Sequence, residues 1–164
     1  MLGITHQQQG VSLVESMIAL LVISVGLLGI AALQITSVGQ NSSALHHSQA
    51  VWAAYDMSDR IRANNSTFAS YAGIDTDTGY TQNCTGIANN CTSAQMVTAD
   101  AADWVTMVSN LPSGRGQIIV NPVDANELLI AVLWDDGGTP GGGANGTACP
   151  IASLSCYTVA VSQQ

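Results

Sequence analysis

The sequence predicts an α+β protein in which a long N-terminal helix, apolar in its first half, packs on a small antiparallel β-sheet with one additional helix. Three observations support this prediction. Residues 16–55 contain no Asp, Glu, Lys or Arg. Apolar residues then continue at helical spacing to about residue 62. Three β-rich runs, each bounded by turn residues, follow in the C-terminal part of the chain.

Composition limits the classes of function that the chain can have. Its 164 residues include three arginines, no lysine and eleven acids, which gives a net charge of -8. Binding to nucleic acid needs clustered basic side chains, so we expect no nucleic-acid partner. A hydrophobic content of 47% is also far above that of disordered chains. These values favour a membrane-attached or secreted protein.

The first apolar stretch is long enough to cross a bilayer as a helix, and we expect a transmembrane segment over residues 13–33. A cleaved secretory signal has a shorter apolar region followed by a small-residue cleavage site. This apolar stretch is longer than that of a secretory signal, and no small-residue cleavage site follows it. The helical pattern instead continues past it. We therefore predict one helix over residues 11–65, ending near Asn64 and Asn65, and a globular region over residues 66–164.

The second half of this helix shows a clear apolar face. Its members share helical spacing, and the charged residues between positions 56 and 62 lie on the other faces. Asp56 and Arg60 stand four positions apart, which favours an ion pair. The apolar face comprises Ala50, Ala53, Ala54, Met57 and Ile61.

The globular region is predicted to contain one helix and three strands. Thr92 and Gln95 form a capping-box pattern, and apolar residues at helical spacing follow as far as Leu111, before the Pro-Ser-Gly sequence at 112–114. The strands are expected as an antiparallel meander over residues 117–121, 127–134 and 156–162. Segment 135–149 is expected to be an exposed loop, and the loops at 73–91 and 135–149 to supply partner choice. The large apolar side chains expected to fill the helix–sheet interface are Trp52, Trp104 and Trp134.

Four cysteines lie in the globular region, namely Cys84, Cys91, Cys149 and Cys156. An even number of cysteines in a small exported region indicates two disulfides, for which three pairings are possible. We favour Cys84–Cys91 and Cys149–Cys156, each of which closes a short loop. The close Cys pairs of zinc sites are absent from the sequence, so we expect no metal site at the cysteines.

Other clusters of polar residues favour ordinary structural roles. Asp75-Thr76-Asp77 resembles the opening of a calcium loop, but the later acidic ligands are missing and a solvated turn is favoured. His46-His47 is interpreted as a subunit contact. Asp100 and Asp103 fit the solvent face of the second helix. The globular region contains no histidine or lysine, so we expect no catalytic residues and no cofactor.

The residues before the apolar helix carry the most specific motif. Gly10 is followed by apolar Val11, and the acid Glu15 stands five positions after the glycine. This start resembles the processing site of type IV prepilins. The resemblance implies that residues 1–10 are a leader, that prepilin peptidase cleaves between Gly10 and Val11, and that the new amino group of Val11 is methylated. It also implies that Glu15 pairs with the amino terminus of a neighbouring subunit and sets the subunit register.

Further stretches resemble a narrower group, the PilV-type minor pilins: residues 59–64, 91–96, 103–116 and 132–135. The resemblance implies a type IV pilin-like fold and a minor pilin that primes pilus assembly with other minor pilins and the major pilin, at or near the pilus tip. It also implies residence in the inner membrane of a Gram-negative bacterium before assembly, with a tip adhesin as a further partner. The alternatives are a minor pseudopilin of a type II secretion system and an unprocessed, membrane-anchored periplasmic binding module.

Overall fold

The computed structural model describes residues 12–82, 84, 90–137 and 154–163. The chain divides into two units, which we describe separately as the stem unit, residues 1–42, and the head unit, residues 43–164. The predicted leader, with Gly10 and Val11, lies outside the described residues, as does most of the predicted loop at 135–149.

Helix α1 spans Leu13–Ala63. Its residues in the stem unit are all exposed. In the head unit, its buried residues are the predicted apolar face with Ser58 added, namely Ala50, Ala53, Ala54, Met57, Ser58 and Ile61. Three of these side chains are alanines, and Met57 and Ile61 are the large ones on this face. The spacing of apolar residues therefore correctly identified the side of the helix that is buried.

A short 3-10 helix, η1, follows α1 at Asn65–Tyr71 and was not expected from the sequence. Polar residues at its start predicted the end of the long helix but gave no sign of a new element. Phe68 and Tyr71 from η1 are buried in the core. The polar stretch after α1 therefore forms a short helix, and two aromatic side chains of this helix pack in the core.

Helix α2 spans Ser93–Val108 and begins with the predicted capping box. The Thr92 hydroxyl accepts a hydrogen bond from the Gln95 backbone, and the Gln95 side chain accepts one from the Thr92 backbone. The helix ends earlier than the apolar spacing suggested. Leu111 lies in the turn that follows α2, and its side chain is buried. Ser113 in the same turn has a φ of 49°. Leu111 matched the apolar spacing of the helix because it is buried, although it is not part of the helix.

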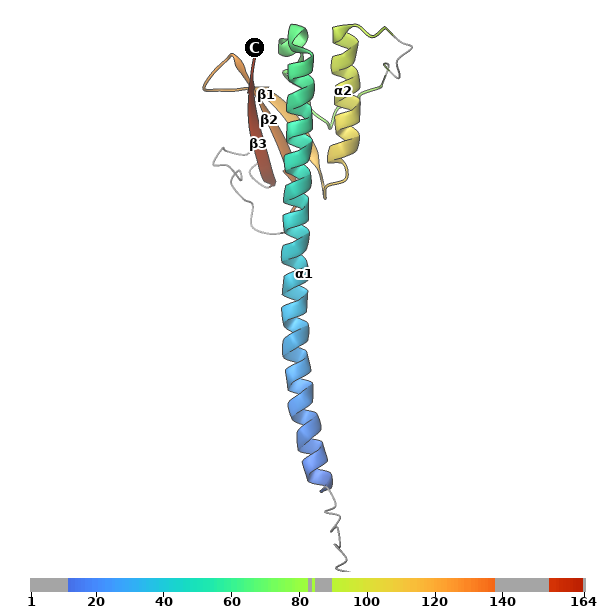
Figure 1. The fold of residues 1–164 in the computed structure, drawn as a ribbon, viewed down its shortest axis with the longest axis vertical. Helices are drawn as coiled ribbons and strands as arrows, with labels where there is room; N and C mark the ends of the chain where they lie inside the picture. The colour runs from blue at the N-terminus through green and yellow to red at the C-terminus, as the bar shows by residue number, and fades with distance from the viewer. Residues whose placement is uncertain (1–11, 83, 85–89, 138–153, 164) are drawn as a thin grey trace, which may run out of the picture. The chain divides into compact units, whose positions relative to one another are not determined.

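The sheet is an antiparallel meander in the order β1-β2-β3, as predicted. Its strands are β1 at Arg115–Val120, β2 at Glu127–Trp134 and β3 at Ser155–Ser162. The register places Ile118 opposite Ile130, and Ile130 opposite Val159. The head unit is therefore a layer of helices on a three-stranded sheet, which confirms the predicted fold class (Figure 1).

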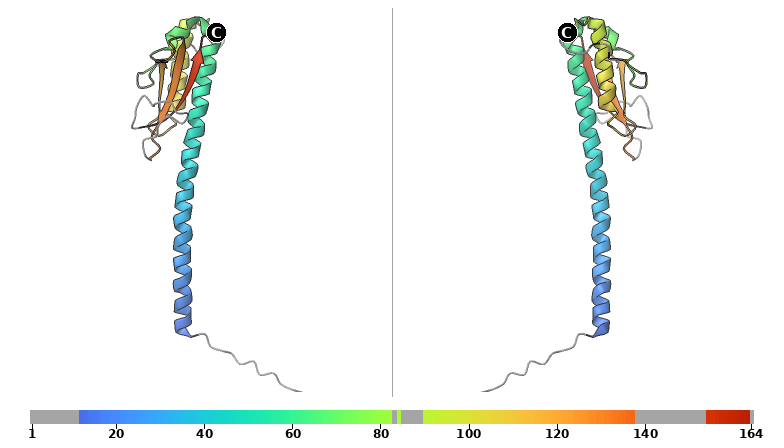
Figure 2. Two further views of the ribbon diagram at one scale, coloured as in Figure 1. Left: turned by 90° about the vertical axis from the view of Figure 1, so that its left-hand side faces the viewer. Right: turned by 90° about the vertical axis from the view of Figure 1, so that its right-hand side faces the viewer.

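The two faces of the sheet differ in what they contact. The α1 segment of the head unit and α2 cover one face, where Ile118, Ile130 and Val132 join the main core (Figure 2). On the other face, Ala131, Leu133 and Cys156 form a second, smaller buried cluster. β2 is consequently buried on both sides, which explains its nearly uninterrupted run of apolar residues.

The outer edge of β1 is covered by the chain segment that follows η1. The Gly73 amide donates to the Ile118 carbonyl, the Ile118 amide to the Ile74 carbonyl, and the Thr76 amide to the Gly116 carbonyl. Asp75 forms an isolated antiparallel bridge with Gln117. The polar backbone groups on this edge of the sheet are therefore largely satisfied within the head unit.

Two of the three tryptophans occupy the interface between the helices and the sheet. Trp104 is fully buried, its Nε1 donates to the Ala53 carbonyl at 2.9 Å, and its ring lies over Gly116 of β1. Trp134 is also buried. The prediction for Trp52 was wrong, because its side chain is 79% exposed. Trp52 lies on α1 outside the face formed by Ala50, Ala53 and Ala54.

Candidate functional site: the N-terminal helix and the polar network of the head unit

The stem part of α1 has the properties of a membrane span. It contains an 18-residue window that is apolar enough to cross a bilayer, and none of that window is buried in the protein. The core helix of a soluble protein would be mostly buried, so the lack of burial favours contact with lipid or with other chains. The Ser24 hydroxyl donates to the Leu21 carbonyl, and that of Thr36 to the Ala32 carbonyl. These polar side chains are therefore satisfied inside the helix itself.

Glu15 lies in the first turn of α1 and is exposed. Among the described residues it has no ion-pair partner. A carboxylate in the first turn interacts favourably with the helix dipole, but a charge near lipid costs at least about 2.5–3.5 kcal/mol at bilayer depth. Glu15 would therefore gain from a positively charged partner. Gly10 and Val11, the predicted processing and methylation positions, lie outside the described residues.

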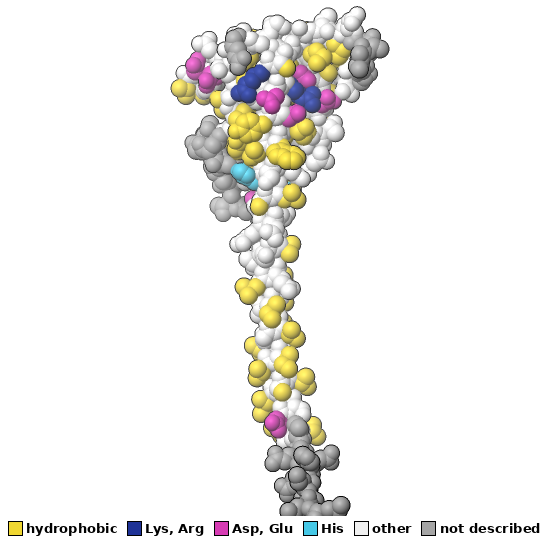
Figure 3. Space-filling view, viewed as in Figure 1, with side chains coloured by type: hydrophobic (Ala, Val, Ile, Leu, Met, Phe, Trp, Pro, Cys, Tyr) yellow, Lys and Arg dark blue, Asp and Glu magenta, His cyan; other side chains and the backbone are white. Residues whose placement is uncertain are grey.

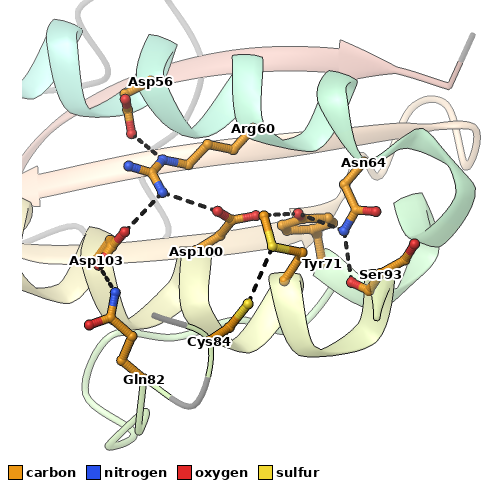
Figure 4. A network of polar contacts seen from close by, with 10 residues as sticks. Asp56, Arg60, Asn64, Tyr71, Gln82, Cys84, Ser93, Asp100 and Asp103 are labelled. Atoms are coloured by element: carbon orange, nitrogen blue, oxygen red, sulfur yellow. Dashed lines mark hydrogen bonds and ion pairs between the residues drawn. The ribbon is translucent and has the colours of Figure 1, made fainter. Parts of the chain in front are cut away.

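In the head unit, Arg60 binds one carboxylate of its own helix, α1, and two carboxylates of α2 (Figure 4). Its Nε donates to Asp56 at 2.6 Å, and its Nη1 donates to Asp100 at 3.0 Å and to Asp103 at 3.2 Å. Burial would lower the pKa of Arg60, but the hydrogen bonds to Asp56 and Asp100 raise it above its ordinary value. The guanidinium therefore remains charged and holds the two helices together.

The same network continues from Asp100 into η1. The Tyr71 hydroxyl donates to Asp100 Oδ2 at 2.6 Å, and Asn64 Nδ2 donates to the Tyr71 hydroxyl at 3.2 Å and to the Ser93 carbonyl at 2.8 Å. Burial raises the pKa of Tyr71, and the bond to Asp100 raises it further. The expectation that Asp100 faces solvent was wrong, because its partners lie on α1 and η1 and the residue is only 5% exposed. Asp103 is half-buried and also accepts from Gln82 at 2.7 Å.

The acidic turn at Asp75 and Asp77 is bound to an arginine of the sheet. Arg115 Nε donates to Asp75 Oδ1 at 3.1 Å, and Arg115 Nη1 lies 2.8 Å from Asp77 Oδ2. Burial would raise the pKa of Asp75, but the hydrogen bonds from Arg115 and Gln117 outweigh that effect and lower it. Within the described ranges, no three His, Cys, Asp or Glu residues are grouped to hold a metal ion. The contacts with Arg115 anchor the segment that covers β1.

His46 and His47 both contact residues of their own head unit. His46 Nδ1 lies 3.8 Å from Asp136 Oδ1, and Ser43 donates to the other oxygen of that carboxylate. The His47 ring packs edge-on against Trp134 and Tyr157, with centroids 6.1 Å and 5.9 Å apart. These residues of α1 therefore contact the end of β2, the residues just after it and β3, which the sequence could not indicate because the partners are 87 to 110 positions away.

Cys84 and Cys91 form a disulfide, with their Cα atoms 6.0 Å apart. This is one of the two pairings that the sequence favoured. Cys156 is also disulfide-bonded, but its expected partner Cys149 lies outside the described residues. The Cys84–Cys91 bridge closes a short loop just before α2, where Cys84 Sγ also lies 3.6 Å from Met96 Sδ.

Two family models match the chain. The prokaryotic N-terminal methylation motif matches residues 5–31, and the Tt1218-like family, described as type IV pilin Tt1218, matches residues 32–102. Comparisons with curated proteins and with solved structures found no match. The two adjoining matches, each of which covers less than half of the chain, together with the long apolar helix and the α+β head unit, indicate a prepilin-like protein that is similar to type IV pilins. Proteins of this class are structural: the methylation motif implies processing by prepilin peptidase, membrane anchoring and assembly with other pilins.

Proposed function

We propose that this protein is a minor pilin of the PilV type, which acts by assembly after its leader is removed. In this proposal, prepilin peptidase cleaves between Gly10 and Val11 and methylates Val11. The observation that carries the proposal is the position of Glu15, an exposed carboxylate in the first turn of a helix that then has no charge until Asp56. The match of residues 5–31 to the methylation motif supports the same interpretation.

Before assembly, the proposed protein resides in the inner membrane of a Gram-negative bacterium with its head unit in the periplasm. During assembly, Glu15 pairs with the methylated amino terminus of an adjacent subunit and fixes the register of the two stems. Packing between stems gains from small residues that let helices approach, and Gly26, Gly29 and the alanines at 31 and 32 supply them. We further propose that the protein primes pilus assembly with other minor pilins and sits at or near the tip. There a tip adhesin is a further partner, and the loops at 73–91 and 135–149 supply partner choice.

The leader is tested by mass spectrometry of the protein purified from a pilus-forming host. We expect loss of residues 1–10 and the addition of one methyl group to the new N-terminus. Gly10→Val should abolish leader removal because the added side chain blocks close approach of the peptidase to the backbone. Gly3→Val, a change elsewhere in the same leader, serves as the matched control and should be processed normally. An intact Met1 in the native chain would identify an unprocessed membrane protein instead.

Assembly is tested separately with Glu15→Ala and Glu15→Gln. Both should reduce the amount of the protein in sheared pili at least about tenfold, because neither retains the negative charge that pairs with the neighbouring amino group. Asp59→Ala removes an exposed carboxylate from the head unit and should leave incorporation unchanged. Normal incorporation of both Glu15 variants would refute the register argument. Recovery of the protein in secretion pseudopili, and its absence from pili, would reassign it to a type II secretion system.

A further inference from the structure

The asparagines of this chain carry a modification motif that the proposed assembly function does not use. Six of its ten asparagines begin an Asn-x-Ser/Thr triplet in which x is not proline. Serine and threonine make up 29 of the 164 residues, so about two such triplets would be expected by chance. This triplet is the acceptor sequence for N-linked oligosaccharides in exported proteins. The six asparagines are Asn41, Asn64, Asn65, Asn83, Asn90 and Asn145.

Backbone conformation separates these triplets. A transferase that binds the asparagine and the hydroxyl residue together needs both side chains on one side of the chain. In an extended segment, residues i and i+2 share a face, whereas in a helix they point in different directions. Asn41 lies inside α1 and Asn65 lies in η1, so neither triplet has the extended form. Asn83 and Asn145 lie outside the described residues.

Asn64 is excluded by its side-chain contacts. Its Nδ2, the atom that would carry the sugar, donates to the Tyr71 hydroxyl at 3.2 Å and to the Ser93 carbonyl at 2.8 Å. Ser66, the hydroxyl residue of the same triplet, lies in η1 and donates to Ser93 Oγ at 3.3 Å. A sugar on Asn64 would therefore break the contact between the end of α1 and the start of α2.

Asn90 has the properties that an acceptor needs. It is exposed, and it makes no hydrogen bond or ion pair among the described residues. Residues 90–92 precede α2, and Thr92 is exposed and extended, with a φ of -72° and a ψ of 157°. Cys91 is tied to Cys84 by the disulfide, so the side chains on either side of it point away from that bond where the backbone is extended. The capping box, in which the Thr92 hydroxyl accepts from the Gln95 amide, holds the threonine in this conformation.

The surroundings of Asn90 suit a bound sugar. The start of α2 lies beside the end of α1, where Asn64 contacts Ser93. At this end of the head unit the visible surface is mostly white in Figure 3, the colour of uncharged polar side chains and of the backbone. An oligosaccharide here would therefore lie on polar, uncharged groups.

We propose that Asn90 is the acceptor of an N-linked oligosaccharide, supplied as a polyprenyl diphosphate-linked sugar on the exported side of the membrane. Asn90 Nδ2 attacks the anomeric carbon and a C–N bond forms. The bond between that carbon and the diphosphate oxygen breaks, and polyprenyl diphosphate leaves with the electron pair. A carboxylate of the transferase takes the amide proton, and nothing is oxidised or reduced. The inference rests on the export of the head unit, which is part of the function proposed above.

The modification is tested on the full-length protein in a bacterium whose oligosaccharyltransferase accepts Asn-x-Thr. Mass spectrometry should find the mass of one oligosaccharide, and fragment spectra should place it on Asn90. Asn90→Gln should abolish this mass, whereas Thr92→Ser should retain it because serine keeps the hydroxyl of the triplet. Asn126→Gln is the matched control: it changes an exposed asparagine outside any triplet and should retain the sugar on Asn90.

A reporter protein with an Asn-x-Thr tail in the same cells shows that the transferase is active. An unmodified Asn90, in chains whose Cys84–Cys91 disulfide has formed and beside a modified reporter, would overturn the proposed acceptor. A sugar placed on a serine or threonine hydroxyl in its stead would overturn it as well. Reduced Cys84 and Cys91 beside a modified reporter would instead overturn the export of the head unit, and with it the proposed function.

Discussion

Replacing Arg60 with glutamine tests whether the polar network holds the head unit together. The Arg60 guanidinium donates to Asp56 on its own helix and to Asp100 and Asp103 on α2. Glutamine has no charge and is too short to reach the α2 carboxylates. Arg60→Gln therefore leaves Asp100, whose side chain is 7% exposed, without its charged partner.

The expected loss follows from the burial of the two groups. Removing one member of a fully buried ion pair costs about 3–5 kcal/mol, because the other charge is left uncompensated. Here the Arg60 side chain is 29% exposed, so solvent screens part of the interaction. The Tyr71 hydroxyl also continues to donate to Asp100 at 2.6 Å. We therefore expect Arg60→Gln to lower the free energy of unfolding by about 2–3 kcal/mol.

The free energy of unfolding is measured by chemical denaturation of the full-length protein in detergent, followed by tryptophan fluorescence. Arg62→Gln is the matched control: its pair with Asp59 is exposed, and the expected loss is below about 1 kcal/mol. In Arg60→Gln with Asp100→Asn, the loss should be smaller than the sum of the single losses, because no buried charge is left unpaired. A loss below about 1 kcal/mol for Arg60→Gln would refute the reasoning.

Three further predictions concern the sheet, the acidic turn and the disulfide. Gly116→Ala should lower the free energy of unfolding by about 1–3 kcal/mol, because a Cβ at this position would lie 2.5 Å from Trp104 Cη2. Thermal unfolding measures the loss, and Gly79→Ala, with no atom within 4 Å, should be nearly neutral. The lowered pKa of Asp75 stabilises the folded state above the ordinary carboxyl value of 3.8, and this contribution is lost as the pH falls through the folded-state value. Arg115→Gln should therefore weaken the pH dependence of unfolding below about pH 4, and an unchanged acid titration of stability would contradict this assignment. Cys84→Ser with Cys91→Ser should cost about 2–3 kcal/mol for the loss of a short loop closure, measured by denaturation against the native protein under non-reducing conditions.

Residue spacing predicted the parts of the fold that depend on local patterns. Three features depend on residues that are only a few positions apart, and they could be predicted from the sequence alone. They are the buried face of α1, the capping box at Thr92 and the three strands. The pair between Asp56 and Arg60 was also local, at four positions apart. Such features can be predicted from the sequence because the interacting groups are close together along the chain.

The predictions that were wrong depended on contacts between distant segments. Asp100 looked like a solvent-facing residue of α2, yet the long Arg60 side chain and the Tyr71 hydroxyl reach it from α1 and η1. Trp52 looked like a core residue because of its size, but the face of α1 that meets the sheet is formed by alanines. Neither outcome could be predicted without knowing how α1, η1 and α2 pack. The processing site at Gly10 and Val11 and the role of Glu15 remain predictions.

The covered edge of β1 has a consequence for the behaviour of many such chains in one membrane. An open strand edge invites pairing with strands of other molecules, and crowded proteins with such edges tend to aggregate. Here residues 73–76 bond the backbone groups of Gly116 and Ile118 on the outer edge of β1, and Arg115 holds their acidic turn. Pairing with strands of other molecules is therefore disfavoured along this part of β1, which lowers the tendency of crowded chains to aggregate through it.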